Sequence, residues 1–139
     1  MAKHSLPLLS CVSAASTLVA LTAFAQNQTV EQVAQTIDAQ HNQNATLMRD
    51  EMTVSSKASA TGKNVRFENV LRVKQGLPKA KLQEFDSETR REIIPRVCAV
   101  QGNEIGFKRG LSYTFSYAST YGERLSEFTV DAKTCGIKQ

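Results

Sequence analysis

The chain of 139 residues has no tryptophan, only two histidines and three cysteines, and no basic run longer than a pair. So few histidines exclude a multi-histidine metal site within one chain. The basic residues are interleaved with acids, as at Arg90-Arg91 between Glu88 and Glu92, which is typical of a solvated surface. With a formal net charge of +4, the chain also lacks the basic footprint of a nucleic-acid-binding protein.

Motifs of catalysis are missing as well. The glycines of residues 102–110 lack the Gly-Lys-Ser ending of a phosphate loop, and no serine is accompanied by a visible base. His41 lies in a polar stretch, where we expect it to be solvated. Carboxylates such as Glu51 or Glu84 could serve a small hydrolase, but surface charge is the simpler interpretation. The sequence therefore predicts no enzyme and no cofactor, with a carboxylate hydrolase as an alternative.

The first 25 residues have the layout of an export signal. A basic start at Lys3 is followed by an apolar run over 14–24 and a small-residue triplet that ends at Ala25. The apolar run is interrupted by hydroxyl residues and is shorter than the roughly 18–20 apolar residues of a membrane span. We expect cleavage before Gln26. Acylation of Cys11 stays open as an alternative, although few residues precede it.

Removal of 25 of the 139 residues leaves 114, enough for one compact domain over 26–139. Loss of Lys3 reduces the formal charge from +4 to +3. Two cysteines remain, Cys98 and Cys135, and in an oxidising compartment the simplest prediction is a disulfide between them. On the chain-entropy model such a bond contributes about 3–4 kcal/mol to stability.

The N-terminal half of this domain predicts a helix and a hairpin. Thr29 with Gln32 fits a capping box, and apolar residues at helical spacing predict a helix over about 29–49. Residues 52–73 alternate between apolar and polar side chains around a turn at 60–63, which is typical of two half-buried antiparallel strands.

The C-terminal half repeats that order. An apolar stripe from Leu82 to Val100 predicts a second helix, which Pro95 should end or kink near Ile94. A short irregular segment follows, and then residues 111–130 predict a second hairpin with Gly122 in its turn. The order α-β-β-α-β-β predicts an α+β fold, with a four-stranded antiparallel sheet covered by helices on one face.

The second hairpin is rich in aromatic residues. Tyr113, Phe115 and Tyr117 share one strand face, and Tyr121 lies in the turn. Aromatic rings serve either as the core face of a sheet or as interface anchors. We predict that the hairpin tip is a protein-binding site, with three contact residues: Tyr117, Tyr121 and Arg124.

One pattern spans most of the domain and resembles that of small exported proteobacterial proteins of unassigned activity, some of them grouped as quorum-sensing-regulated secreted virulence factors. It consists of Asp50-Glu51-Met52-Thr53, Val97-Cys98, the stretch 110–117, Gly122 and Cys135. The resemblance implies an exported α+β domain with one disulfide. It carries no catalytic residues.

Together these features predict a non-enzymatic binding protein of the periplasm or extracellular space. Its partner would be another protein, as for an inhibitor, an immunity-like protein or a secreted virulence-associated factor. The alternative is an envelope assembly factor held at the outer membrane, which acylation of Cys11 would favour.

Overall fold

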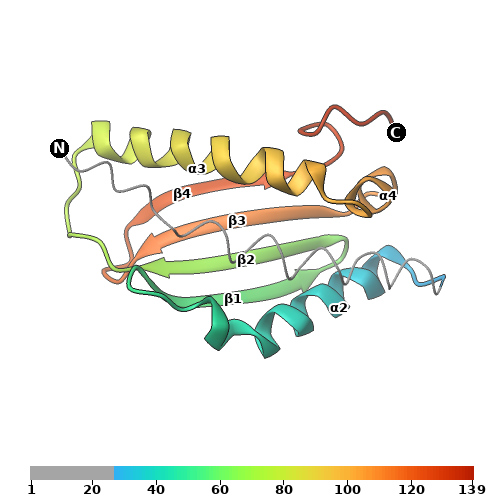
Figure 1. The fold of residues 1–139 in the computed structure, drawn as a ribbon, viewed down its shortest axis with the longest axis horizontal. Coiled ribbons are helices and arrows are strands. Elements are labelled where there is room, and N and C mark those ends of the chain that lie inside the picture. The colour runs from blue at the N-terminus through green and yellow to red at the C-terminus, as the bar shows by residue number, and fades with distance from the viewer. Residues whose placement is uncertain (1–26) are drawn as a thin grey trace.

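The computed structural model describes residues 27–139; the predicted signal peptide, 1–25, and Cys11 lie outside the described residues. The chain folds into helices on one side of a four-stranded sheet (Figure 1). In chain order the elements are α2 (Val30–Gln43), the short 3-10 helix η2 (Ala45–Met48), β1 (Thr53–Thr61), β2 (Asn64–Leu71), α3 (Lys79–Ala99), α4 (Asn103–Lys108), β3 (Ser112–Ser119) and β4 (Arg124–Val130).

The sheet is mixed, which corrects the prediction of an entirely antiparallel one. Its order is β1-β2-β3-β4, with two antiparallel hairpins and a parallel pair, β2 and β3, at the centre. The parallel pairing follows from α3. A helix of 21 residues is about 30 Å long, which matches a strand of eight residues. It therefore returns the chain to the end of the sheet at which β2 began, so β3 runs in the same direction as β2.

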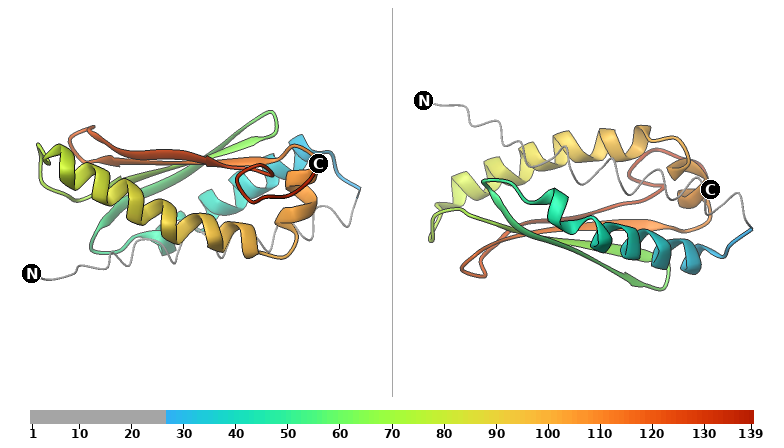
Figure 2. Two further views of the ribbon diagram at one scale, coloured as in Figure 1. Left: turned by 90° about the horizontal axis from the view of Figure 1, so that it is seen from above. Right: turned by 60° about the horizontal axis from the view of Figure 1, so that its bottom comes forward.

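Both long helices lie on one side of the sheet (Figure 2). α2 packs mainly on β1, and α3 packs on β4. The strands alternate accordingly: Val65 and Phe67 on β2, like Tyr113 and Phe115 on β3, point to the helices and are at most 1% exposed. This shared apolar layer forms the core, and the opposite side of the sheet faces solvent. The predicted arrangement of helices on one face is confirmed.

The first helix begins as the sequence predicts but ends earlier. Thr29 and Gln32 form the capping box, with Gln32 N–H donating to Thr29 Oγ1 at 3.2 Å and Thr29 N–H donating to Gln32 Oε1 at 2.9 Å. α2 ends at Gln43, and a separate 3-10 turn carries the chain on to Met48. The prediction of one helix over 29–49 was wrong in that detail, because Asn44 caps α2: its N–H bonds back to the Gln40 and His41 carbonyls.

Pro95 does not end the second helix. α3 continues from Lys79 to Ala99, five residues past the predicted end at Ile94. Proline removes the hydrogen bond to the carbonyl four residues earlier, here that of Arg91. Pro95 and Arg91 are both exposed, so water can satisfy that carbonyl.

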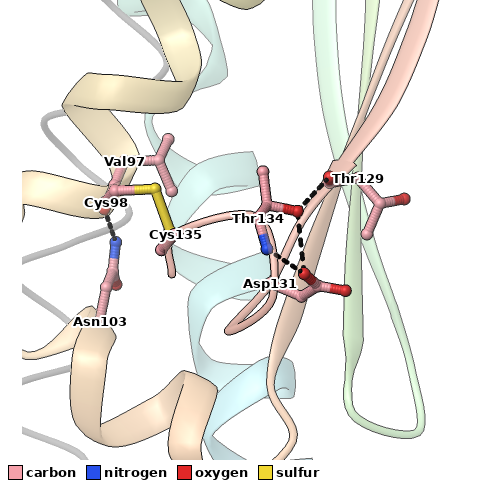
Figure 3. The surroundings of a disulfide bond; sticks show 7 residues. All are labelled: Val97, Cys98, Asn103, Thr129, Asp131, Thr134 and Cys135. Carbon is pink, nitrogen blue, oxygen red and sulfur yellow. Dashed lines mark hydrogen bonds between the residues drawn. A yellow bond between two sulfur atoms is a disulfide. The ribbon is translucent and has the colours of Figure 1, made fainter. Parts of the chain in front are cut away.

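A disulfide ties the end of α3 to the C-terminal segment, joining Cys98 to Cys135 across 37 residues (Figure 3). Beside it, Asn103 is fully buried and donates from Nδ2 to the Val97 carbonyl at 2.9 Å. Asn103 is the first residue of α4, which lies in the segment that we predicted to be irregular, and Phe107 on α4 is fully buried. Within residues 27–139 no helix combines the length and apolar content of a membrane span.

Candidate functional site

Polar side chains form one row across the helix-facing side of the sheet. Ser56 on β1 is paired in register with Asn69 on β2, Asn69 with Tyr117 on β3, and Tyr117 with Ser126 on β4. All four are buried. We call these four residues the polar row. It is the one level of the sheet at which polar atoms replace the apolar layer on every strand.

His41 of α2 meets the β1 end of the polar row. Its Nε2 lies 2.8 Å from Ser56 Oγ, and Ser56 Oγ donates to Asn69 Oδ1 at 2.8 Å. The imidazole also packs edge-on against Phe67, at 5.0 Å between ring centroids. His41 is 1% exposed, so the expectation of a solvated histidine was wrong. Burial lowers the pKa of His41 below its ordinary value of 6.5.

The contact of His41 with Ser56 does not make an activated nucleophile. A hydroxyl has one hydrogen, and Ser56 donates it to Asn69. His41 Nε2 must then be the donor to Ser56, which is the reverse of what a general base does. Because both side chains are also at most 3% exposed, the contact is structural.

The other end of the polar row meets α3. Ser126 Oγ donates to Asp86 Oδ1 at 2.6 Å, and Arg90 Nε donates to Asp86 Oδ2 at 2.9 Å. Desolvation alone would raise the pKa of Asp86, but these two hydrogen bonds outweigh it and lower the pKa. The Arg90 guanidinium also lies over the Phe128 ring, at 5.1 Å from its centroid. Each long helix is thus joined to the sheet by one end of the row.

The predicted contact residues do not form one surface. Tyr117 belongs to the core: it is 1% exposed, its ring packs edge-on against Phe85, and its hydroxyl is buried without a hydrogen-bond partner. Burial raises the pKa of the Tyr117 phenol. Tyr121, in contrast, is 59% exposed, and the Arg124 side chain is 70% exposed. Of the three predicted contact residues, only Tyr121 and Arg124 are accessible at the hairpin tip, and these two remain predicted contact residues.

The hairpin tip is held in place by its neighbours. Gly122 takes a positive φ of 82°, as the sequence predicts for the turn. Both carboxylate oxygens of Glu123 accept from the Gly76 N–H, at 3.0 and 3.1 Å, which fixes the tip against the loop before α3. Thr120 N–H donates to the Leu71 carbonyl at 3.1 Å and extends the parallel pairing. Tyr121 is therefore exposed on a turn that hydrogen bonds to Gly76 and Leu71 hold in place.

The carboxylates considered for hydrolysis lie on the surface. Glu84 pairs with Lys81 at 2.8 Å on α3, and Glu51 is exposed before β1, where its carbonyl accepts from Arg72. Over residues 27–139 no group of histidine, cysteine and acidic side chains has an arrangement that could hold a metal ion.

The sequence interpretation missed the His41–Ser56–Asn69 contacts. A signal was present, because His41 continues the apolar stripe of its helix at a spacing of four residues from Ile37 and seven from Ala34. Ser56 and Asn69 likewise occupy inward positions of the strand alternation. Their positions on the inward faces of the helix and strands, rather than the polarity of the flanking residues, predict that all three lie in the core.

Comparison with known proteins gives fold relatives only. No protein-family model matches the chain, and no curated protein does. Among solved structures, a candidate secreted protein of Pseudomonas aeruginosa is 14% identical, with a TM-score of 0.61 over 83% of this chain and 96% of that one. The type II secretion system pilotin AspS of Vibrio cholerae is 17% identical, with a TM-score of 0.54 over 84% and 99%.

A second pilotin, EpsS of the Vibrio vulnificus type 2 secretion system, is 14% identical, with a TM-score of 0.53 over 76% of this chain and 91% of that one. At these identities the likeness establishes a shared fold. The described chain thus has the fold found in a candidate secreted protein and in two secretion-system pilotins.

Proposed function

We propose that this chain is an exported, non-catalytic protein of the bacterial envelope that binds another protein and assists the assembly of an envelope complex. The observation that carries the proposal is the fold likeness to two pilotins over 99% and 91% of their lengths. No large part of those chains lacks a counterpart here. The export pattern of residues 1–25 supports the same location.

The described residues support a binding role over a catalytic one. In the buried contact of His41 with Ser56, the serine hydroxyl donates its hydrogen to Asn69, so His41 is not placed to act as its base. The candidate carboxylates are exposed. What the surface offers instead is an exposed tyrosine and arginine on a braced turn, residue types enriched at interface hot spots.

A secreted factor is the second candidate, favoured by the TM-score of 0.61 with the Pseudomonas aeruginosa protein. The two candidates differ in where the chain ends up. An assembly factor stays with the envelope, whereas a secreted factor leaves the cell.

The test uses the full-length gene with a C-terminal tag in its native bacterium. Mass spectrometry of the mature N-terminus distinguishes an acylated Cys11, which favours an outer-membrane assembly factor, from a free Gln26. Chemical crosslinking and detergent extraction of the envelope should recover a defined partner, and deletion of the gene should reduce the assembled form of that partner's complex.

Recovery of the tagged chain in the culture supernatant, with no envelope partner, would favour the secreted factor. Turnover of a substrate that is lost in Glu51→Gln or Glu84→Gln would overturn the non-catalytic assignment and revive the hydrolase.

A further inference from the structure

The C-terminal half of α2 lies along the outer edge of the sheet, beside β1 (Figure 1). An edge strand exposes backbone N–H and C=O groups that can pair with another chain. Here side chains of α2 occupy three of them. The Asn42 amide bonds Ala58 twice, accepting from its N–H and donating to its carbonyl, both at 2.8 Å. Asp38 Oδ2 accepts from the Ala60 N–H at 2.8 Å.

These three bonds imitate the pairing that a fifth strand would make. Asn42 supplies one donor and one acceptor to the same residue, as a neighbouring strand does in an antiparallel ladder. These three backbone groups of the β1 edge stay covered while residues 38–43 are docked. We call these residues the β1 cover.

His41 is the buried member of the β1 cover. Since Ser56 donates its hydrogen to Asn69, His41 must carry its proton on Nε2. Nδ1 is then a bare acceptor, and it is buried without a hydrogen-bond partner. A second proton on this ring would create a buried N–H with nothing to accept it.

No charged side chain of the neighbouring elements faces the imidazole. Lys57 on β1, and Arg66 and Glu68 on β2, alternate with the inward residues and so point to the solvent-facing side. η2 carries no charged residue. On α2 itself, the Asp38 carboxylate bonds the Ala60 N–H at the strand edge. An imidazolium formed here would therefore be a buried charge without a counter-charge.

We propose that residues 38–43 are an acid-sensitive cover over the outer edge of β1, released when His41 is protonated. The neutral ring docks into the core, whereas the charged ring is stable only in water. Moving His41 into water takes the adjacent Asn42 off Ala58, because the two residues share one helical turn. Release bares the backbone groups of Ala58 and Ala60 to pairing with an extended segment of another chain. The proposal does not depend on the proposed function.

The expected pH dependence has a definite sign. In the open cover His41 titrates near its ordinary value of 6.5, and in the closed cover burial lowers its pKa. The open form therefore binds more protons, and opening becomes about tenfold more favourable for each pH unit below 6.5 until the closed form also binds a proton. Between pH 7.5 and 5 this amounts to an increase of up to about 30-fold in the opening equilibrium.

The test is backbone amide hydrogen exchange by NMR on the purified, 15N-labelled chain, corrected for the intrinsic pH dependence of exchange. The Ala58 and Ala60 amides should lose up to about 30-fold of their protection between pH 7.5 and 5. The Phe67 amide, in the central strand β2, should keep its protection. In His41→Gln, which retains a donor toward Ser56 but does not titrate, the pH dependence should vanish.

Asn42→Ala serves as the matched control. It should expose the Ala58 amide at every pH while the Ala60 amide, which Asp38 holds, keeps its acid sensitivity. Equal acceleration at Ala58, Ala60 and Phe67 would overturn the proposal, because it would mean global unfolding. Unchanged protection at pH 5 would also overturn it. Should His41→Gln fail to fold, the His41 imidazole resonances of the wild type decide: titration near pH 6.5 with Ala58 still protected contradicts the proposal.

Discussion

Arg66 on β2 and Glu127 on β4 form an ion pair across β3, on the side of the sheet that faces solvent. Arg66 also pairs with Glu68 at 3.1 Å, and Glu127 with Arg124 at 3.6 Å. The Arg66 and Glu127 side chains are 36% and 27% exposed, so solvent screens the pair only partly. The network links β2 to β4 over β3, on the face that the helices leave uncovered.

We expect a double-mutant cycle of Arg66→Met and Glu127→Gln to give a coupling of about 0.5–1 kcal/mol in the free energy of unfolding, reduced in 1 M salt. The hydrogen bond from Arg66 lowers the pKa of Glu127 below 4.5. The coupling should therefore be complete above pH 4.5 and be lost as the pH falls through the lowered value. Urea unfolding between pH 7 and 2 measures it; a coupling that grows on acidification would contradict the assignment. The exposed pair of Lys81 with Glu84 is the control.

The disulfide yields a prediction about both chemistry and stability. Thiol titration of a chain that begins at Gln26, the predicted mature start, and is denatured without reductant should find no free thiol. Cys98→Ser should lower the free energy of unfolding by about 2–4 kcal/mol, since the unfolded chain loses the 37-residue constraint. Cys135→Ser should give the same loss. Two free thiols in the unmodified chain, or a loss below about 0.5 kcal/mol, would show that the bond does not form in solution.

Two buried tyrosines on β3 predict opposite responses to the loss of a hydroxyl. Tyr113 OH donates to Asn103 Oδ1 at 3.1 Å, so Tyr113→Phe leaves a buried acceptor unsatisfied and should cost about 1–2 kcal/mol. The Tyr117 hydroxyl has no partner, so Tyr117→Phe should be neutral or slightly stabilising. Thermal and chemical denaturation of the two variants side by side measure the difference. Equal destabilisation would mean that Tyr117 has a partner in solution.

The hairpin tip predicts a separation of binding from stability. Tyr121→Ala should leave the melting temperature unchanged. It should weaken binding of the partner recovered by crosslinking by about 1–3 kcal/mol. Tyr117→Ala should lower the free energy of unfolding by about 3–5 kcal/mol, because it empties a core site. Ile105→Ala, at an exposed position on α4 at the opposite end of the molecule (Figure 1), is the surface control. Full affinity in Tyr121→Ala would remove the tip from the interface.

Local pattern predicted local structure well. The alternation around residues 60–63 and around Gly122 specifies the two hairpins, because inward and outward side chains differ in polarity on each strand. How the hairpins join is not a local property. The β2–β3 pairing brings Asn64 beside Ser112, 48 residues apart, and nothing in either strand's alternation distinguishes a parallel neighbour from an antiparallel one.

The same distinction explains the outcome at the candidate site. Exposure of Tyr121 follows from its place in a turn, which sequence can indicate. Burial of Tyr117 depends on packing against Phe85 of α3. Burial of His41 depends on its contacts with Ser56 and Phe67. Those are tertiary contacts, and the polarity of the flanking residues pointed the other way for His41.

The parallel central pair also joins two strands that are far apart in the chain. β2 ends at Leu71 and β3 begins at Ser112. During synthesis, which starts at the N-terminus, both strands of the β1–β2 hairpin are therefore available well before β3 has been made. In that interval the inner edge of β2 has no partner, and α3 has no strand to cover because it packs on β4. Strand pairing between residues so far apart in the sequence forms slowly, and an unpaired strand edge is prone to aggregation until its partner strand pairs with it. A chain truncated within the β3–β4 hairpin would therefore keep the β1–β2 hairpin but leave the inner edge of β2 unpaired.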